Sequence, residues 1–165
     1  MALNPAAPVF PSNLVVLIGD RLKAIDDQII VHRRPLRMSD GNLTIGIYAT
    51  EWNPVEGSYE VSGTHPGEPT LQNYTFEVCV GVSDTEEERG LALSSIISSS
   101  IRSMLARDSV LKTVLSQVQV TFLGTLERVQ RWMITRQRFI SAEYQRTFYF
   151  MSVLDLVVQT ESVPS

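Results

Sequence analysis

The run of residues Tyr144–Thr160 constrains the fold of this chain most strongly. It reads YQRTFYFMSVLDLVVQT, lacks Pro and Gly, and is rich in β-branched and aromatic residues, which predicts one long strand. A strand that buries one face alternates apolar with polar residues, whereas this run is apolar on most of both faces. Fully extended, it would span about 55 Å at ~3.3 Å per residue, and a compact domain of this length is only about 40 Å across. We therefore expect it to bend, to bulge or to reach another copy of the chain, and we interpret it as an assembly surface.

The two faces of this predicted strand have different composition. The more apolar face carries Tyr144, Phe148, Phe150, Leu154, Leu156 and Val158. The second face carries Tyr149, Met151, Val153 and Val157 and is interrupted by polar residues. Since one face is enough to pack on the chain's own core, we expect these four residues of the second face to contact another subunit.

Composition and charge narrow the possible classes of protein. The chain has 165 residues, of which 44% are hydrophobic and 19% charged, so we expect one globular domain over residues 1–165. Its formal net charge of −4 gives no general attraction to nucleic acid or to anionic lipid. We expect no membrane span, because no apolar stretch approaches ~20 residues, and we expect synthesis in the cytoplasm, because the first residues do not resemble a signal peptide.

The first half of the chain predicts a helix and three strands. Apolar residues at helical spacing predict an amphipathic helix over Leu14–Ile25. Strands are predicted at Gln28–His32, from Leu43 to Ala49 and, with almost ideal alternation, from Tyr74 to Val82. We expect residues 1–12 to form an extended N-terminal segment. Residues 51–73 are rich in Gly, Pro, Ser and Glu, so we expect a long loop there, with Trp52 and Tyr59 available to dock on a neighbouring subunit.

The second half predicts a long helix and further strands. Thr85 and Glu88 have the spacing of a capping box, and the helix that follows runs to about Ala106, with Leu93 among its buried residues. A short helical turn follows over 110–115, then strands over 118–122 and from Leu126 to about Ile140, with a turn at 141–143 before the last strand. The predicted class is α+β: a mixed, mainly antiparallel sheet with an N-terminal helix and a long central helix packed on one face.

The sequence contains no motif of a known catalytic or metal site. There is no phosphate-binding glycine loop, no dinucleotide fingerprint, no zinc-protease motif and no nucleophile elbow. His32 and His65 are the only histidines, and Cys79 is the only cysteine. A metal site requires several converging ligands. We therefore expect no catalytic residue, no metal and no cofactor.

Four arginines follow one another closely in the predicted strand after Gly124: Arg128, Arg131, Arg136 and Arg138. On a regular strand, three of them, at positions 128, 136 and 138, would share a face with Trp132. Such a group suits contact with another protein subunit or with a nucleic-acid backbone. It is also compatible with a solvated strand face whose arginine stems cover apolar neighbours. Because arginine and aromatic residues are enriched at protein interfaces, we favour subunit contact.

The order and character of these segments resemble the tail terminator proteins of long-tailed bacteriophages. The resemblance covers the helix over Leu14–Ile25, the strand Tyr74–Val82, the helix Glu86–Arg107 and the closing runs GTLERVQRWMITRQRF and YQRTFYFMSVLDLVVQTE. It implies a non-enzymatic subunit of the virion that forms a ring of six copies. In that family the ring caps the finished tail tube, stops polymerisation of the tube and offers the surface for head joining.

The resemblance also implies partners and a location. Its partners would be other copies of the chain, the tail tube protein, and the connector or neck proteins between head and tail. Duplex DNA would pass through the lumen without sequence-specific binding, and the protein would lie at the head-proximal end of the tail. A different position in the virion, as a head-completion or neck connector protein, is the alternative. A small metal-dependent hydrolase or nuclease built from converging carboxylates is a more distant alternative.

Overall fold

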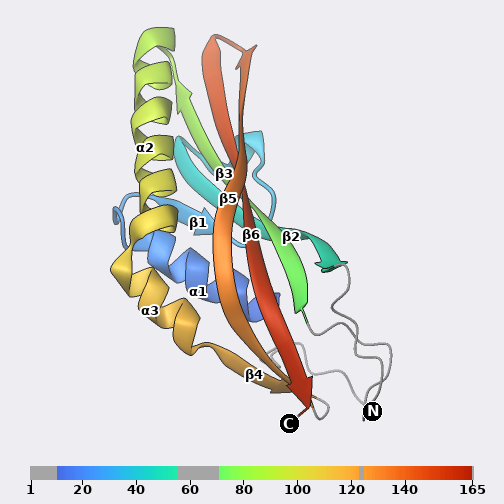
Figure 1. Ribbon diagram of the computed structural model, residues 1–165. Coiled ribbons are helices and arrows are strands. Elements are labelled where there is room, and N and C mark those ends of the chain that lie inside the picture. Colours follow the sequence, from blue (N-terminus) through green and yellow to red (C-terminus); the bar gives the residue numbers. More distant parts are fainter. Residues whose placement is uncertain (1–10, 56–70, 123–124, 165) are drawn as a thin grey trace.

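The computed structural model describes residues 11–55, 71–122 and 125–164 of the chain. These residues form an α+β fold, as the sequence predicts (Figure 1). The helices are α1 (Ser12–Lys23), α2 (Glu87–Arg107) and α3 (Ser109–Gln117), and a 3-10 turn covers Met38–Asp40. The strands are β1 (Ile30–His32), β2 (Leu43–Pro54), β3 (Leu71–Asp84), β4 (Gln119–Phe122), β5 (Thr125–Tyr144) and β6 (Thr147–Pro164).

The strands form one six-stranded sheet in the order β1-β2-β3-β6-β5-β4. Only β1 and β2 are parallel; the other neighbours are antiparallel. The three helices lie on one side of this sheet (Figure 1), which we call the helix face, and the opposite side is the second face. The expected mixed, mainly antiparallel sheet with helices packed on one face is therefore confirmed. None of the described helices is long and apolar enough to cross a membrane.

The core lies between the helices and the two central strands. The predicted alternation of β3 is confirmed on its core side by Tyr74, Phe76, Val78, Val80 and Val82, which are at most 8% exposed. From α1, the stripe residues Leu14, Ile18 and Leu22 pack against this layer, and all three are fully buried. Ile101 and Leu105 of α2 and Leu111 and Leu115 of α3 complete it.

The long closing strand lies inside its own sheet. β6 pairs with β3 over the whole length of β3 and with β5 over the whole length of the β5–β6 hairpin. The expectation that this run reaches another copy of the chain is therefore wrong for its backbone, because both of its edges are paired within one subunit. Figure 1 shows that β5 and β6 curve together along the tall sheet beside α2, so the sheet itself accommodates their length.

The boundaries of several elements differ from the predictions. The β5–β6 turn is at Gln145 and Arg146, not at 141–143, and both residues have positive φ, of 50° and 62°. Two consecutive residues of positive φ are typical of a two-residue hairpin turn, usually marked by Asn-Gly or Asp-Gly. This chain carries no such signal there. Residues 51–54 and 71–73 belong to strands and not to a loop, α1 begins at Ser12, and residues 1–10 and 56–70 lie outside the described part.

Two serines take part in the contact between α2 and the sheet, beside the core residues Ile101 and Leu105. Ser94 and Ser98 are 4% and 1% exposed, whereas Leu93, predicted to be buried, is 37% exposed. Small side chains allow the helix to lie close to the strands. A buried hydroxyl costs free energy unless it forms a hydrogen bond, and the Ser98 hydroxyl donates to the carbonyl oxygen of Ser94. Gly90 shows the same closeness, because a Cβ there would lie 2.6 Å from the ring of Phe150.

The predicted capping box at the start of α2 does not form. Glu86 is the N-cap and has no side-chain capping bond. Instead the Asp84 carboxylate accepts from the backbone N–H of Glu86 at 2.9 Å and from the Arg89 guanidinium at 2.7 Å. These hydrogen bonds, with that of Arg89 first in size, lower the pKa of Asp84 from 3.8 to about 2. Asp84 thus takes the role expected of Thr85.

Candidate functional site

Two β-bulges decide which way the arginines of β5 point. The register with β6 shifts between Val129 and Arg131 and again between Ile134 and Arg136, so Gln130 and Thr135 are the extra residues. Each extra residue exchanges the two faces for all residues that follow it. Paired residues of neighbouring strands lie on the same side of a sheet, so the side of each β5 residue follows from its β6 partner.

The bulges bring the four arginines together. Their partners in β6 are Glu161 for Arg128, Gln159 for Arg131, Asp155 for Arg136 and Val153 for Arg138. All four partners occupy odd positions of β6, so all four arginines lie on the second face. Trp132 pairs with Val158 on the helix face. The expectation from a regular strand, that arginines share a face with Trp132, is therefore wrong, because the strand is not regular.

The arginines at the two ends of this group have carboxylate partners within the chain. Arg128 forms an ion pair with Glu161 at 2.7 Å. Arg138 lies 3.0 Å from Glu77 and 3.5 Å from Asp155, and Glu77 also accepts a hydrogen bond from the Tyr48 hydroxyl. This network is internal to the sheet. It assigns Arg128 and Arg138 a structural role within the subunit, whatever else they contact.

The two arginines in the middle of the group are different. Arg131 and Arg136 are exposed, and neither forms an ion pair with any described residue. Both lie on the edge strand β5: Arg131 begins the short regular stretch between the bulges, and Arg136 follows the second bulge. Two exposed cations without a carboxylate partner form a basic patch at this edge, which we call the arginine edge (Arg131 and Arg136).

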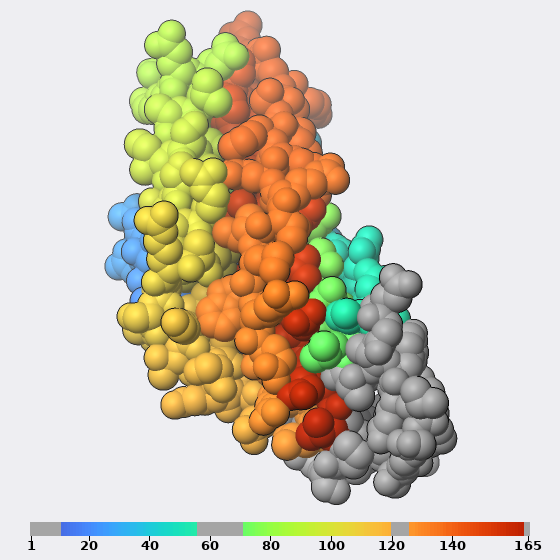
Figure 2. All heavy atoms as spheres, viewed as in Figure 1, coloured from blue at the N-terminus to red at the C-terminus, as the bar shows by residue number. Residues whose placement is uncertain are grey.

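The outer edge of β5 is open along most of its length. β4 pairs only with 125–128 of β5, and from 129 to 144 this edge has no strand partner among the described residues. Figure 2 shows β5, in orange, at the surface beside α2. Large apolar side chains are exposed along it: Met133 at 45%, Phe139 at 69%, Ile140 at 52% and Tyr144 at 57%. Unpaired edges with exposed apolar side chains are sites where another strand adds.

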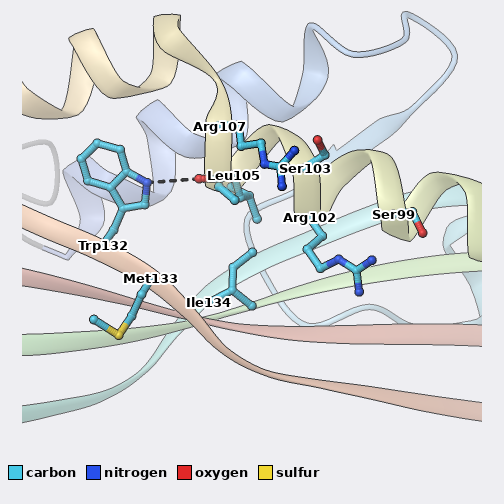
Figure 3. Close-up of a pocket in the computed structure, with 9 residues that line it drawn as sticks. Ser99, Arg102, Ser103, Leu105, Arg107, Trp132, Met133 and Ile134 are labelled. Atoms are coloured by element: carbon cyan, nitrogen blue, oxygen red, sulfur yellow. Dashed lines mark hydrogen bonds between the residues drawn. The ribbon is translucent and has the colours of Figure 1, made fainter.

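A groove of about 680 Å³ runs between this edge and the C-terminal half of α2 (Figure 3). Its α2 side includes the polar side chains of Ser99, Arg102 and Ser103, and its β5 side is formed by Trp132 and Ile134. Met133 also borders the groove, but its side chain points away from α2, to the second face (Figure 3). The indole N–H of Trp132 donates to the carbonyl oxygen of Leu105 at 3.1 Å, which fixes the ring between helix and strand. The groove therefore has one rigid apolar wall directly beside an unpaired strand edge.

Trp52 lies at the opposite side of the sheet. It belongs to β2 and not to a loop, so that prediction is wrong, and its indole N–H donates to Gln72 at 2.8 Å. Its side chain is nevertheless 49% exposed. β1 covers only 44–46 of β2, so the outer edge of 47–54 has no strand partner among the described residues. Tyr59 lies outside the described residues.

The four predicted contact residues of β6 lie on the second face as expected, but they are less accessible than expected. Val153 is only 3% exposed, and Tyr149, Met151 and Val157 are half-buried. Cross-strand neighbours from β3 and β5 flank them on the second face, and Leu36, Arg37 and Met38 lie near Met151. There Leu36 lies over Gly46 and Gly81, where an added Cβ would come within about 3 Å of its side chain.

A half-buried carboxylate on the helix face, that of Glu127, was not predicted. Glu127 accepts hydrogen bonds from the Gln72 amide at 2.5 Å and from the Thr160 hydroxyl at 2.6 Å, and Tyr74 also bonds to it. Burial raises the pKa of Glu127 above its ordinary 4.5, and these hydrogen bonds offset part of that effect. The only sequence signal is that Gln72 and Thr160 interrupt otherwise apolar core positions. No pattern in the chain indicates that they meet at Glu127.

Glu127→Gln is expected to change how stability depends on pH. A carboxyl group whose pKa is raised by folding stabilises most below its unfolded pKa, and this contribution falls as pH rises through the unfolded and then the folded value. Glutamine does not ionise, so the variant should gain free energy of unfolding relative to the native chain as pH rises above 4.5. Urea denaturation at several pH values measures this difference, and parallel profiles of the two proteins would contradict it.

No group of three or more potential metal ligands occurs among the described residues. Compared with models of known protein families and with curated protein sequences, the chain gives no match.

Proposed function

We propose that this chain is a non-enzymatic tail terminator of a long-tailed bacteriophage, which forms a ring, six-membered by the family resemblance. The observation that carries the proposal is the open outer edge of β5, with four large exposed apolar side chains and the arginine edge. A monomer that exposed such an edge would be liable to aggregate. A defined contact with another copy of the chain covers it.

A head-to-tail contact fits the asymmetry of this sheet. One side of the sheet ends in the β5 edge beside α2, and the other ends in β1 and the outer part of β2. A contact between two unlike surfaces closes into a ring when the rotation between copies is a simple fraction of a turn. A C2 dimer would instead pair one surface with itself, which would bring the two arginine edges together.

The charge of the chain is compatible with a lumen through which DNA passes. The formal net charge is −4, and proteins that hold DNA tightly do so through many cationic contacts with phosphates. In the proposed role the ring lies at the head-proximal end of the tail. It contacts the tail tube protein on one side and connector or neck proteins on the other.

The test uses the full-length protein with tail tube protein from the same phage genome. Light scattering should give a mass several times 18.5 kDa, for the free protein or for complexes on tube ends, and the protein should stop tube polymerisation when added to growing tubes. A protein that stays monomeric and leaves tube growth unchanged would contradict the proposal. Rings that bind only the portal side would identify a neck connector, and metal-dependent cleavage of a substrate would identify an enzyme.

A further inference from the structure

The two open edges of the sheet lie at the same level along the strands. We call two residues level when the strand pairing connects them directly across the sheet. Through β3 and β6, the pairing connects Glu51 of β2 with Met133 of β5, and Trp52 with Trp132. In the same way, the open stretch 47–54 of β2 corresponds to 129–137 of β5. Both stretches lack a strand partner among the described residues, and they lie at opposite sides of one sheet.

The side chains of the two open stretches also lie on corresponding faces of the sheet. Trp52 pairs with Tyr74 of the core, so it lies on the helix face, which is also the side of the α2–β5 groove. Glu51 pairs with Thr75, so it lies on the second face with the arginine edge. An exposed aromatic ring is thus available for the groove, and the Glu51 carboxylate is available for Arg131 and Arg136, which form no ion pair with a described residue.

The direction of the strands is suitable as well. β2, β3, β6 and β5 alternate in direction, so β5 runs opposite to β2. A rotation about an axis along the strands keeps the direction of every strand and keeps the helix face on the same side of every copy. A closed ring also requires that neighbouring copies are not displaced along this axis. Residues at the same level along the strands in one copy are therefore at that level in the next copy too. The resulting pair would be antiparallel.

We propose that the ring closes by addition of β2 of one copy, through residues 47–54, to the outer edge of β5 of the next copy. The inference rests on the proposed ring and names its contact. Glu51 of one copy lies beside Met133 of its neighbour, between Arg131 and Arg136. Trp52 of that copy enters the groove beside Trp132. Main-chain hydrogen bonds between the two strands give the contact its affinity. The indole ring of Trp52 in the groove and the ion pairs of Glu51 with the arginine edge determine the register of the two strands.

The bulges limit where this pairing occurs. Bulges usually protect an edge against unwanted pairing, and β5 has two. The regular stretch between them, 131–134, is the part that is level with Glu51 and Trp52. The bulges therefore leave a short docking window and align Arg131 and Arg136 on one face, which favours one register over others.

Disulfide cross-linking tests the proposed register. Glu51→Cys and Met133→Cys in the same chain place two thiols on opposite edges at positions that are exposed in the subunit. Directly opposed residues of antiparallel strands have Cα atoms about 4.5–5.5 Å apart, within the range that disulfides span. Oxidation should give a ladder of covalent multimers on a non-reducing gel, ending at the closed ring and abolished by reductant.

A matched pair of controls makes the result specific. Glu51→Cys with Ile140→Cys keeps the same face and a similar exposure, because Ile140 is 52% exposed, but moves the second thiol about 20 Å along the sheet. It should give no ladder. Either single-cysteine variant tests whether native Cys79, which is 3% exposed, contributes.

The outcomes separate this inference from the proposed function. A ladder from the first pair alone supports the β2–β5 contact. A ring by light scattering without that ladder, or with an equal ladder from the Ile140 pair, overturns the contact or its register and leaves the ring intact. A monomer that gives no ladder and has no effect on tube growth overturns both.

Discussion

Replacing Phe76 with alanine is expected to lower the free energy of unfolding by about 3–5 kcal/mol, the usual cost of truncating a buried phenylalanine. Phe76 is fully buried in β3, one of the two central strands, so the loss includes both its transfer from water and the cavity left behind. Urea denaturation followed by circular dichroism measures the change. A chain of this size has little stability to spare, so the variant should unfold at a much lower urea concentration.

Phe139→Ala provides the matched control for this prediction. Phe139 is also a phenylalanine in a long strand, but its side chain is 69% exposed, so its replacement should change stability by no more than about 0.5 kcal/mol. Equal losses at both positions would mean that the layer around Phe76 is not the core. A large loss at Phe139 alone would mean that the β5 edge is covered within the subunit.

Reversing the arginine edge is expected to abolish assembly. Arg131→Glu combined with Arg136→Glu would leave three carboxylates, two of them new and the third that of Asp155, at the position where Glu51 of a neighbouring copy has to dock. Like charges brought together at an interface cost several kcal/mol, and each ~1.4 kcal/mol weakens association tenfold. Sedimentation velocity should show monomers at concentrations where the native chain forms rings.

Charge restoration separates a contact from a general defect. Glu51→Arg added to the double reversal recreates opposite charges across every subunit contact and should recover rings in part. Both arginines and Glu51 are exposed, so none of these changes should lower the stability of the monomer by more than about 0.5 kcal/mol. Rings formed by the double reversal variant itself would show that this edge is outside the contact.

The elements with strict periodicity could be predicted from the sequence. The alternation of apolar and polar residues in β3 and the helical spacing of apolar residues in α1 each predict one face that must be buried. The order of residues within a few positions is enough to identify such a face. Ser94 and Ser98 show where this reasoning fails. The sequence presents them as part of a polar side of α2, but they are buried, since the helix approaches the sheet too closely for larger residues. Closeness between elements is a property of packing and has no periodic signal.

The candidate site depended even more on tertiary structure. The four arginines and Trp52 are interface candidates from their residue types alone, and their role stays a prediction. Their faces could not be predicted, because the bulges at Gln130 and Thr135 exchange the two sides of β5. A bulge arises from how two strands pair, and neither residue type marks it. Glu127 was missed because its partners, Gln72 and Thr160, lie far from it in the sequence.

By itself the sequence determined that this chain forms an α+β fold with a long, apolar closing strand. Composition and hydrophobic periodicity determine secondary structure from residues that are close together in the chain. Only the tertiary structure decided that this strand is central in the sheet and that β5 is the open edge instead. Strand order depends on contacts between distant segments, which local patterns do not encode. The same contacts place Glu51 level with Met133, and the proposed contact between copies rests on that correspondence.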